Sequence, residues 1–519
     1  MICGKKDFSG GLPLGLRLRV AATSIIVFCL IAQTSQNQRL IPIQQVHAAD
    51  EPTTTYWLNL AQNAWEYFQP GKGVDSATGL HQAGLWFPDF TDWDLGVYVQ
   101  AIIDAKKLGL ISDDGSWGAN ARFNKILEFL ETRQRTPDGQ PYVWYSSENG
   151  QNVFGTSTQA VEDAGKLLLS LNNLKLLKPD LAPRIDNIVY NLHNYEPLAG
   201  YLDTQRSSTS IYRYYAAMGF AGFWPDRFSP VANAILDNII MAPTVSTYGV
   251  ELPQSQLTCE PLLLSFFELP LDTRLQKLAK SVYFAHEARS LATGKYIAFS
   301  EGNTELSYSP YVYEYVILPD GQTWVRQDVS GRATQIPEII YLKVAVSFLA
   351  IYNTTFARNM VDSLMARLAP ALSYQLAGYG EGVDENGRAC YTPYDKTNAL
   401  IIGAARYAIE STQQNRLPSP NQSQYPSAIP IPPSTSTTAS TPLSNSTEDT
   451  SFDSSSNSTL APTPPLAPSE SKESLFTAKQ ESAIYSAAAT LLLVGTTAAF
   501  LFIKRRRRAI DPDASEVSC

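Results

Sequence analysis

The sequence has few of the side chains that build metal centres and disulfide scaffolds. Its 519 residues contain 4 histidines and 5 cysteines. The histidines at positions 47, 81, 193 and 286 are scattered, without the close Cys or His neighbours that a zinc site needs. The cysteines are too few to hold a fold together, because disulfide-built proteins are dense in them. The sequence therefore predicts no bound metal and no cofactor.

Several common catalytic and nucleotide-binding motifs are also absent. The chain has no Gly-x-Ser-x-Gly elbow and no phosphate-binding or dinucleotide loop in a strand-to-helix context. Its net charge is -9 and its pI is near 5.2, whereas nucleic-acid-binding proteins usually carry a basic stripe. Any chemistry is thus expected from carboxylates, and the expected partner is a polysaccharide or oligosaccharide, with no nucleic acid.

The N-terminal segment resembles a secretory signal. Basic residues precede an apolar run at 20–32, and small residues at Ala48 and Ala49 suit a cleavage site. We therefore predict a signal peptide over residues 1–49. The polar gap after residue 32 is long for such a peptide, so an uncleaved N-terminal anchor is the alternative.

The C-terminal part has two further segments. Residues 418–480 are rich in Pro, Ser, Thr and Asn, a composition that predicts a disordered extracellular stalk. Residues 483–503 carry no charge and are followed at once by Lys504 and four arginines. About 20 apolar residues can cross a bilayer, and basic clusters stay on the cytoplasmic side. We predict a transmembrane helix at 481–503, a cytoplasmic basic tail at 504–519, and a single-pass protein of the cell membrane that is mainly extracellular; a buried helix with a basic tail is the alternative.

Residues 50–417 form the predicted folded domain, in which apolar residues recur at helical spacing. The predicted helices are 56–68, 94–108, 120–133, 158–177, 184–193, 211–220, 230–241, 261–268, 272–291, 337–352, 356–368 and 396–409. Strand signals favour only one β-hairpin, formed by residues 311–318 and a partner strand after Gly321. Such helices form antiparallel pairs, and six pairs close into an all-α (α/α)6 toroid. A helical array that does not close is the alternative.

The sequence does not decide whether Cys259 and Cys390, the two cysteines of this domain, form a disulfide. An oxidising compartment would allow them to form a disulfide. Because both lie beside apolar or aromatic residues in the sequence, two buried free thiols are equally consistent.

Carboxylates are the candidates for catalysis. Glycoside cleavage uses one carboxyl group to protonate the leaving oxygen and a second to activate water or attack the sugar. The candidates are Asp92, Asp94, Glu162, Asp163, Glu260, Glu301, Glu305 and Glu381. Those beside loop aromatics rank highest, which predicts Glu301, Glu260 and Asp94 as catalytic. The alternatives are helix capping for Asp94 and Glu260, and a structural hydrogen bond or an exposed charge for Glu162 and Asp163.

The stretch 259–324 combines carboxylates and tyrosines and is predicted to form the floor of a glycan site. Aromatic faces suit the C–H faces of sugars. The predicted substrate-binding residues are Asp92, Trp93, Trp86, Tyr308, Tyr311, Glu381 and Trp324. Core packing is the alternative for each tryptophan, and around Glu381 the neighbouring glycines are also explained by turn geometry.

Several short segments, taken in order, resemble the domain-of-unknown-function 3131 family, a glucoamylase-like group. They are residues 90–96 (Phe-Thr-Asp-Trp-Asp-Leu-Gly), 161–168, 212–220, 248–253, 259–261, 293–301 and 396–401. The resemblance implies an α/α toroid and glycan chemistry. Two positions depart from the family pattern, with Arg213 in place of an acidic residue and Lys166 in place of an arginine. If that acidic residue is catalytic in the family, this chain binds glycan without cleaving it.

These observations together predict a membrane-anchored extracellular protein that hydrolyses a polysaccharide with a carboxylate pair. A non-catalytic surface module that binds glycan or packs in a cell envelope is the main alternative. A lyase is the third reading, because Tyr308 or Tyr311 beside Glu301 would supply the base that elimination needs.

Overall fold

The computed structural model describes residues 52–85, 87–305, 311–373 and 377–413. The chain divides into two units, Met1–Pro430 and Ile431–Cys519, and every described residue belongs to the first. The predicted signal peptide, stalk, transmembrane helix and basic tail lie outside the described residues, as do residues 50–51 and 414–417 of the predicted domain. Within the described ranges, no helix combines the length and hydrophobicity that a bilayer crossing requires.

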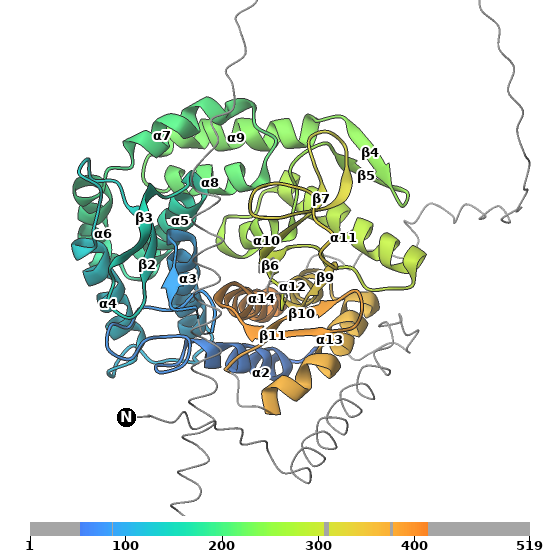
Figure 1. The fold of residues 1–519 in the computed structure, drawn as a ribbon, viewed down its shortest axis with the longest axis horizontal. Helices are drawn as coiled ribbons and strands as arrows, with labels where there is room; N and C mark the ends of the chain where they lie inside the picture. The colour runs from blue at the N-terminus through green and yellow to red at the C-terminus, as the bar shows by residue number, and fades with distance from the viewer. Residues whose placement is uncertain (1–51, 86, 306–310, 374–376, 414–519) are drawn as a thin grey trace, which may run out of the picture. The chain divides into compact units, whose positions relative to one another are not determined.

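Six helices stand side by side in a closed ring at the centre of the domain (Figure 1). Each packs against the next in sequence order, and the last packs against the first. These inner helices are α3 (Asp92–Lys107), α5 (Val161–Leu177), α8 (Ile211–Ala221), α10 (Cys259–Glu268), α12 (Leu342–Tyr352) and α14 (Asp395–Gln413).

A second set of helices surrounds this ring (Figure 1). Each inner helix is preceded in the chain by at least one of them. They are α2 (Thr54–Trp65), α4 (Ala119–Thr132), α6 (Ala182–Asn187), α7 (Glu196–Asp203), α9 (Pro225–Met241), α11 (Thr273–Thr293) and α13 (Thr355–Ser373). The alternation of outer and inner helices agrees with the predicted toroid, and the ring closes where α14 packs on α2 and α3.

Burial separates the two sets of helices. All eleven residues of α12 are buried, because an inner helix contacts its ring neighbours and the outer layer at once. The outer helix α9 buries only Phe228, Val231, Ala232, Ile235, Leu236 and Ile239, which recur three or four residues apart. This spacing covers one face of a helix and leaves the other to solvent.

The inner helices run in the same direction. Lys396 and Asp94, both in the first turn of their helices, form an ion pair. Arg406, the twelfth residue of α14, forms an ion pair with Asp104, the thirteenth residue of α3, at 2.6 Å. Pairs at matching depths require that α3 and α14 are parallel. Glu260, in the first turn of α10, contacts Trp93 and Lys343 in the first turns of α3 and α12, so these N-termini gather at one end of the ring.

The helix predictions are confirmed more fully than the strand predictions. Each of the twelve predicted helices overlaps an observed one, and the predicted helix 184–193 spans both α6 and the π-helical turn η3 (Ile188–Leu192), whereas α7 was missed. The predicted hairpin is present as β7 (Tyr311–Ile317) and β8 (Thr323–Gln327).

The domain is mostly helical as predicted, but it contains four small antiparallel sheets, of which the prediction included only the β7–β8 hairpin. Their strands have two to seven residues, too short for a clear alternating pattern. The sheets are β1 (Asp89–Phe90), β2 (Tyr142–Ser146) and β3 (Asn152–Thr158); β4 (Thr244–Thr247) and β5 (Val250–Pro253); β6 (Glu301–Asn303), β7 and β8; and β9 (Ile339–Tyr341), β10 (Gly380–Asp384) and β11 (Ala389–Pro393).

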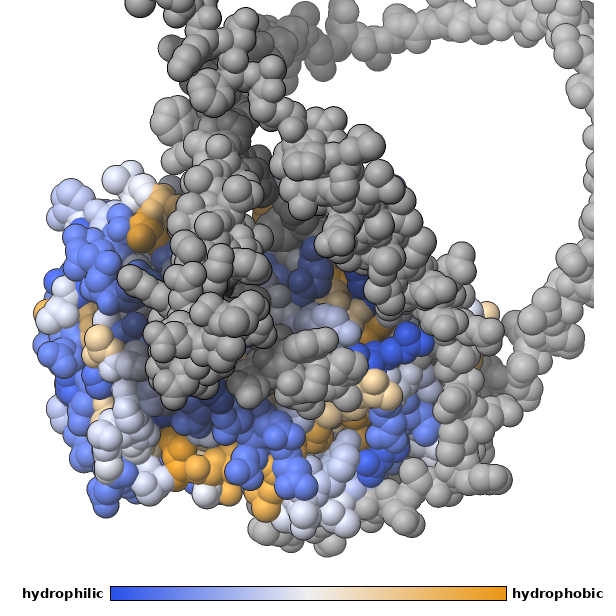
Figure 2. Space-filling model, turned by 60° about the horizontal axis from the view of Figure 1, so that its bottom comes forward, coloured by the Kyte–Doolittle hydropathy of each residue, from blue (hydrophilic) through white to orange (hydrophobic). Residues whose placement is uncertain are grey.

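Hydrophobic side chains at the surface are scattered. On the face shown in Figure 2 the described surface is mainly hydrophilic, with separate small hydrophobic patches. The most exposed large apolar residues are Leu176, Val329, Met241 and Phe154, which lie on different elements. Isolated apolar residues of this kind are normal on soluble domains.

Two glycines allow α5 and α8 to touch backbone to backbone. A Cβ atom on Gly219 would lie 1.9 Å from the carbonyl oxygen of Gly165, and one on Gly165 would lie 2.4 Å from the Cα of Ala216. No side chain fits at either position, so these glycines set the spacing of two neighbouring inner helices.

We expect Gly219→Ala to destabilise the domain by at least about 1–3 kcal/mol, because the added methyl group pushes α8 away from α5. The matched control is Gly200→Ala on α7, where a Cβ meets nothing within 4 Å. This control should change stability by less than about 1 kcal/mol, towards greater stability, since alanine favours helix. Urea unfolding followed by circular dichroism measures both; equal effects would disprove the tight contact.

Candidate active site

Polar side chains occupy the first turn of every inner helix. Because these helices are parallel, the side chains meet at one end of the ring, where the positive ends of six helix dipoles also converge and favour negative charge. The residues are Asp92 and Asp94 on α3, Glu162 and Asp163 on α5, Tyr212 on α8, Glu260 on α10, Lys343 on α12, and Asp395 and Lys396 on α14.

Glu260 is held from two sides. The indole Nε1 of Trp93 donates a hydrogen bond to its Oε1 at 3.1 Å, and the Lys343 ammonium forms an ion pair with its Oε2. The Glu260 residue is only 1% exposed. Burial lowers the pKa of Lys343, but Glu260, Glu381 and Glu301 together raise it above its usual value, so the lysine stays charged.

Glu301 lies beside this pair, on strand β6. Lys343 Nζ also donates to the backbone carbonyl of Glu301 at 2.7 Å, and the Tyr212 hydroxyl donates to Glu301 Oε2. Burial, followed by the nearby charge of Glu260, raises the Glu301 pKa from 4.5 to about 7. The structure therefore brings together the two carboxyls predicted as a catalytic pair and gives them different partners.

Glu381, on β10, completes this group. Thr397 Oγ1 donates to its Oε2 at 2.7 Å. A Cβ atom on Gly302 would lie 2.9 Å from the same oxygen, which places Glu381 against strand β6. Burial raises its pKa to about 7, although Lys343 opposes the shift. Glu381 was predicted to bind substrate; at 1% exposure it instead contacts other residues of the site.

The two aspartates at the start of α3 have structural partners. Asp92 forms an ion pair with Arg133, and both side chains are fully buried, so Asp92 is not placed to bind substrate as predicted. Asp94 sits in a capping box with Thr91, the N-cap of α3, and forms an ion pair with Lys396. Burial raises the Asp94 pKa, but Lys396 and Thr91 lower it below its usual value. These contacts favour the capping alternative over a catalytic role.

The predicted aromatic residues fall into three groups. Trp93 and Tyr311 lie at the site: the Trp93 ring is 6.1 Å from that of Tyr212, and Lys396 Nζ is 6.0 Å from the Tyr311 ring. Trp324 lies apart, against His286 and Phe299 and under Arg289, so the structure does not place it with the carboxylates. Trp86 and Tyr308 lie outside the described residues.

Sequence reasoning missed several residues of the site. Lys343 and Tyr212 gave no usable signal, because each lies within an otherwise apolar helix start. Tyr313 and Tyr315 gave a clear one: Tyr311, Tyr313 and Tyr315 alternate along β7 and therefore share one face. The ring centroids of Tyr311 and Tyr313 are 5.1 Å apart. Those of Tyr313 and Tyr315 are 6.2 Å apart, and these two rings are stacked.

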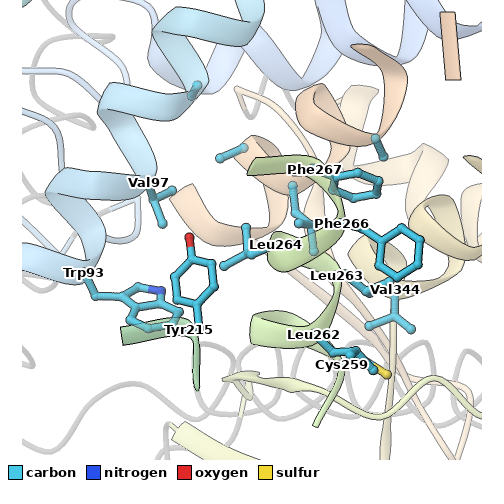
Figure 3. Close-up of a cluster of buried hydrophobic side chains, with 14 of the residues drawn as sticks. Trp93, Val97, Tyr215, Cys259, Leu262, Leu263, Leu264, Phe266, Phe267 and Val344 are labelled. Carbon is cyan, nitrogen blue, oxygen red and sulfur yellow. The ribbon is translucent and has the colours of Figure 1, made fainter. Parts of the chain in front are cut away.

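Below the carboxylates, the ring axis is filled. Trp93 and Tyr215 lie side by side next to Val97, with Leu264 and the other apolar side chains of α10 beyond them (Figure 3). Deeper, Lys166 Nζ contacts both oxygens of Glu268 at 2.8 Å. A cavity of about 10 Å³ near these residues has room for about one water molecule. A ligand therefore does not pass through the ring.

The described cysteines and histidines are buried, and Cys259 Sγ lies 3.8 Å from His286 Nε2, which also accepts from the Phe299 N–H. Cys259 and Cys390 are buried free thiols, so the disulfide alternative is not realised. His81 Nε2 lies 3.1 Å from Asp395 Oδ2 with both side chains fully buried. Among residues 52–413 that the structure describes, no group of His, Cys, Asp and Glu is arranged to hold a metal ion.

The raised pKa of Glu301 predicts a pH-dependent stability. Between pH 4.5 and about 7 the folded state binds this proton more tightly than the unfolded chain, so the free energy of unfolding falls as pH rises through that window. We expect Glu301→Gln to reduce this fall by roughly 2–3 kcal/mol. Urea unfolding at pH 5 and pH 8 measures it, with the exposed Glu128→Gln as control. An unchanged pH difference in Glu301→Gln would contradict the raised pKa.

Solved structures share this fold at low sequence identity. A presumed glucoamylase from Bacteroides caccae has a TM-score of 0.51 and 13% identity, covering 68% of this chain and 94% of that one. An endo-β-1,2-glucanase from Chitinophaga pinensis, in complex with sophorotriose and glucose, has a TM-score of 0.48 and 12% identity over 68% of this chain and 93% of that one. At such identities the likeness concerns the fold alone.

Sequence comparison gives the family. No curated protein matches the chain significantly. Residues 59–411 match the family described as proteins of unknown function, DUF3131, and this region contains every residue of the candidate site. The match spans more than half of the chain and agrees with the resemblance of the short segments. The chain therefore belongs to the DUF3131 family.

Proposed function

We propose that this protein hydrolyses glycosidic bonds of a polysaccharide, with Glu301 as the proton donor. The observation that carries the proposal is the Glu260–Lys343–Glu301 arrangement, in which Lys343 pairs with one carboxylate and donates to the backbone of the other. A carboxyl group whose pKa is raised by burial and by a neighbouring negative charge, as that of Glu301 is, is typical of a general acid. With a pKa of about 7, Glu301 keeps a proton near neutral pH and can transfer it.

Glu260 supports this step by its charge. It was predicted as the second catalytic carboxylate, but both of its oxygens already accept from Trp93 and Lys343. Its negative charge is among the causes that raise the Glu301 pKa, second only to burial. Glu260 therefore keeps Glu301 protonated, and a different carboxylate must activate the water.

The tyrosines of β7 suit the recognition of sugar. Tyr311 and Tyr313 are half-buried, so part of each ring stays accessible beside Glu301. Aromatic faces bind the C–H faces of pyranose rings, and their hydroxyls bond sugar hydroxyls. Because tyrosine rings carry no net charge, this face suits a neutral glycan.

A glycan-binding protein without catalysis is the second candidate. Most of the carboxylates at this end of the ring are paired individually: Asp92 with Arg133, Asp94 with Lys396, and Glu162 with Arg213. Individually paired carboxylates favour binding over cleavage, whereas their gathering at one end of the toroid favours hydrolysis.

The place of action rests on the sequence alone. The apolar segment 481–503 with its basic tail, and the N-terminal signal-like segment, support a single-pass anchor with the domain outside the cell. We propose that the substrate is an extracellular or envelope polysaccharide within reach of the membrane.

Purified full-length protein should release reducing ends from at least one of a panel of α-glucans, β-glucans including β-1,2-glucan, galactans and envelope polysaccharides. We expect Glu301→Gln to lower kcat by about 100-fold or more, because no group then protonates the leaving oxygen. Glu128→Gln on the outer helix α4 is the control and should keep full activity. No release from any glycan, with equal glycan binding by both proteins, would establish the binding alternative.

A further inference from the structure

Asp163 differs from the carboxylates around it in having no protein partner. In the described part of the chain, Glu162 pairs with Arg213, Asp94 with Lys396 and Glu260 with Lys343, while no hydrogen bond or ion pair reaches the Asp163 carboxylate. It is also half-buried, whereas Asp94 and Glu260 are each 1% exposed. Asp163 is therefore free to meet a ligand.

The fold places Asp163 at the same end of the ring as Glu301. Asp163 is in the first turn of α5, and the neighbouring inner helices are α3 on one side and α8 on the other. The first turn of α8 carries Tyr212, whose hydroxyl bonds Glu301. Tyr313 lies within electrostatic range of both acids, because burial raises its pKa and the charges of Glu301 and Asp163 add to that shift.

We propose that Asp163 is the catalytic base that activates the attacking water, a role that rests on the proposed glycoside hydrolysis. The water oxygen forms a bond to the anomeric carbon and gives a proton to Asp163. The glycosidic C–O bond breaks, its electron pair stays with the leaving oxygen, and Glu301 supplies the proton that this oxygen takes up. Water is the only co-reactant, so the step balances.

The surroundings of Asp163 suit a general base. Burial, followed by Asp94, Glu162 and Asp92, raises the Asp163 pKa well above its usual value, while Lys396 opposes the shift. A carboxylate with a raised pKa accepts a proton more readily than an ordinary aspartate, and so removes one from water more effectively. An ion pair would cancel this advantage, which agrees with the absence of a cation partner in the described residues.

The test compares full-length wild-type protein with Asp163→Asn and Asp163→Ala on the glycan that wild type cleaves. We expect Asp163→Asn to lower kcat at least 100-fold with little change in KM. Azide carries no proton to be removed, so it should replace water without a base, restore activity to Asp163→Ala and yield a glycosyl azide. The matched control is Asp226→Asn, an exposed aspartate in the first turn of the outer helix α9, which should keep full activity.

The possible outcomes separate this inference from the proposed function. Retained activity in a folded Asp163→Asn protein, or a loss expressed only in KM and not rescued by azide, would overturn the role of Asp163 alone. No cleavage by wild type on any glycan would overturn both. Thermal unfolding checks the variants, and Asp163→Asn should fold, because it removes a carboxylate that has no partner and lies near three others.

Discussion

The buried contact of Lys343 with Glu260 and with the Glu301 carbonyl is the interaction on which the site depends. It joins α12, α10 and strand β6, three elements far apart in the sequence, through one ammonium group. Burying an ion pair requires the desolvation of both charges. Removing one partner leaves the other charge buried without compensation, which lowers the stability of the fold by about 3–5 kcal/mol. The pair therefore fixes the relative position of these elements. It also places the negative charge of Glu260 and the positive charge of Lys343 near Glu301, where both affect the Glu301 pKa.

The toroid explains why so many acids gather in one place. Parallel inner helices bring six N-termini together, and their unpaired N–H groups and dipoles favour carboxylates there. Without nearby cations or hydrogen-bond donors, these carboxylates would repel one another. Three cations offset this repulsion, the buried Arg133 and Lys343 and the partly buried Lys396, and hydroxyl donors such as Tyr212 and Thr397 bind further carboxylates.

Helical periodicity was sufficient to predict most of the fold. The outer helix α9 has one apolar face, and the inner helix α12 is apolar over nearly its whole length, so both stand out from their loops. Apart from the β7–β8 hairpin, the β-strands were missed because they are short and pair with segments that no local pattern identifies, as β9 does with β10. Glu260 and Glu301 were chosen from their aromatic neighbours, and the structure does bring them together. Trp324 was chosen by the same reasoning, yet it packs on α11, because proximity in sequence does not determine which side of a strand faces the site.

Lys166 and Arg213, the two positions where the resemblance predicts a departure from the family, affect the site differently. Lys166 contacts both oxygens of Glu268 deep in the ring, so a lysine supplies the cation there. Arg213 pairs with Glu162, and its guanidinium lies 4.9 Å from the Tyr201 ring. An acidic residue at position 213 would instead repel Glu162 and add to the negative charge around Asp163. Arg213 thus forms an ion pair with Glu162 and leaves Asp163 as the unpaired carboxylate in the first turn of α5. Glu260 and Glu301 keep their own partners. The lost acidic residue does not by itself remove the carboxyl groups that hydrolysis needs.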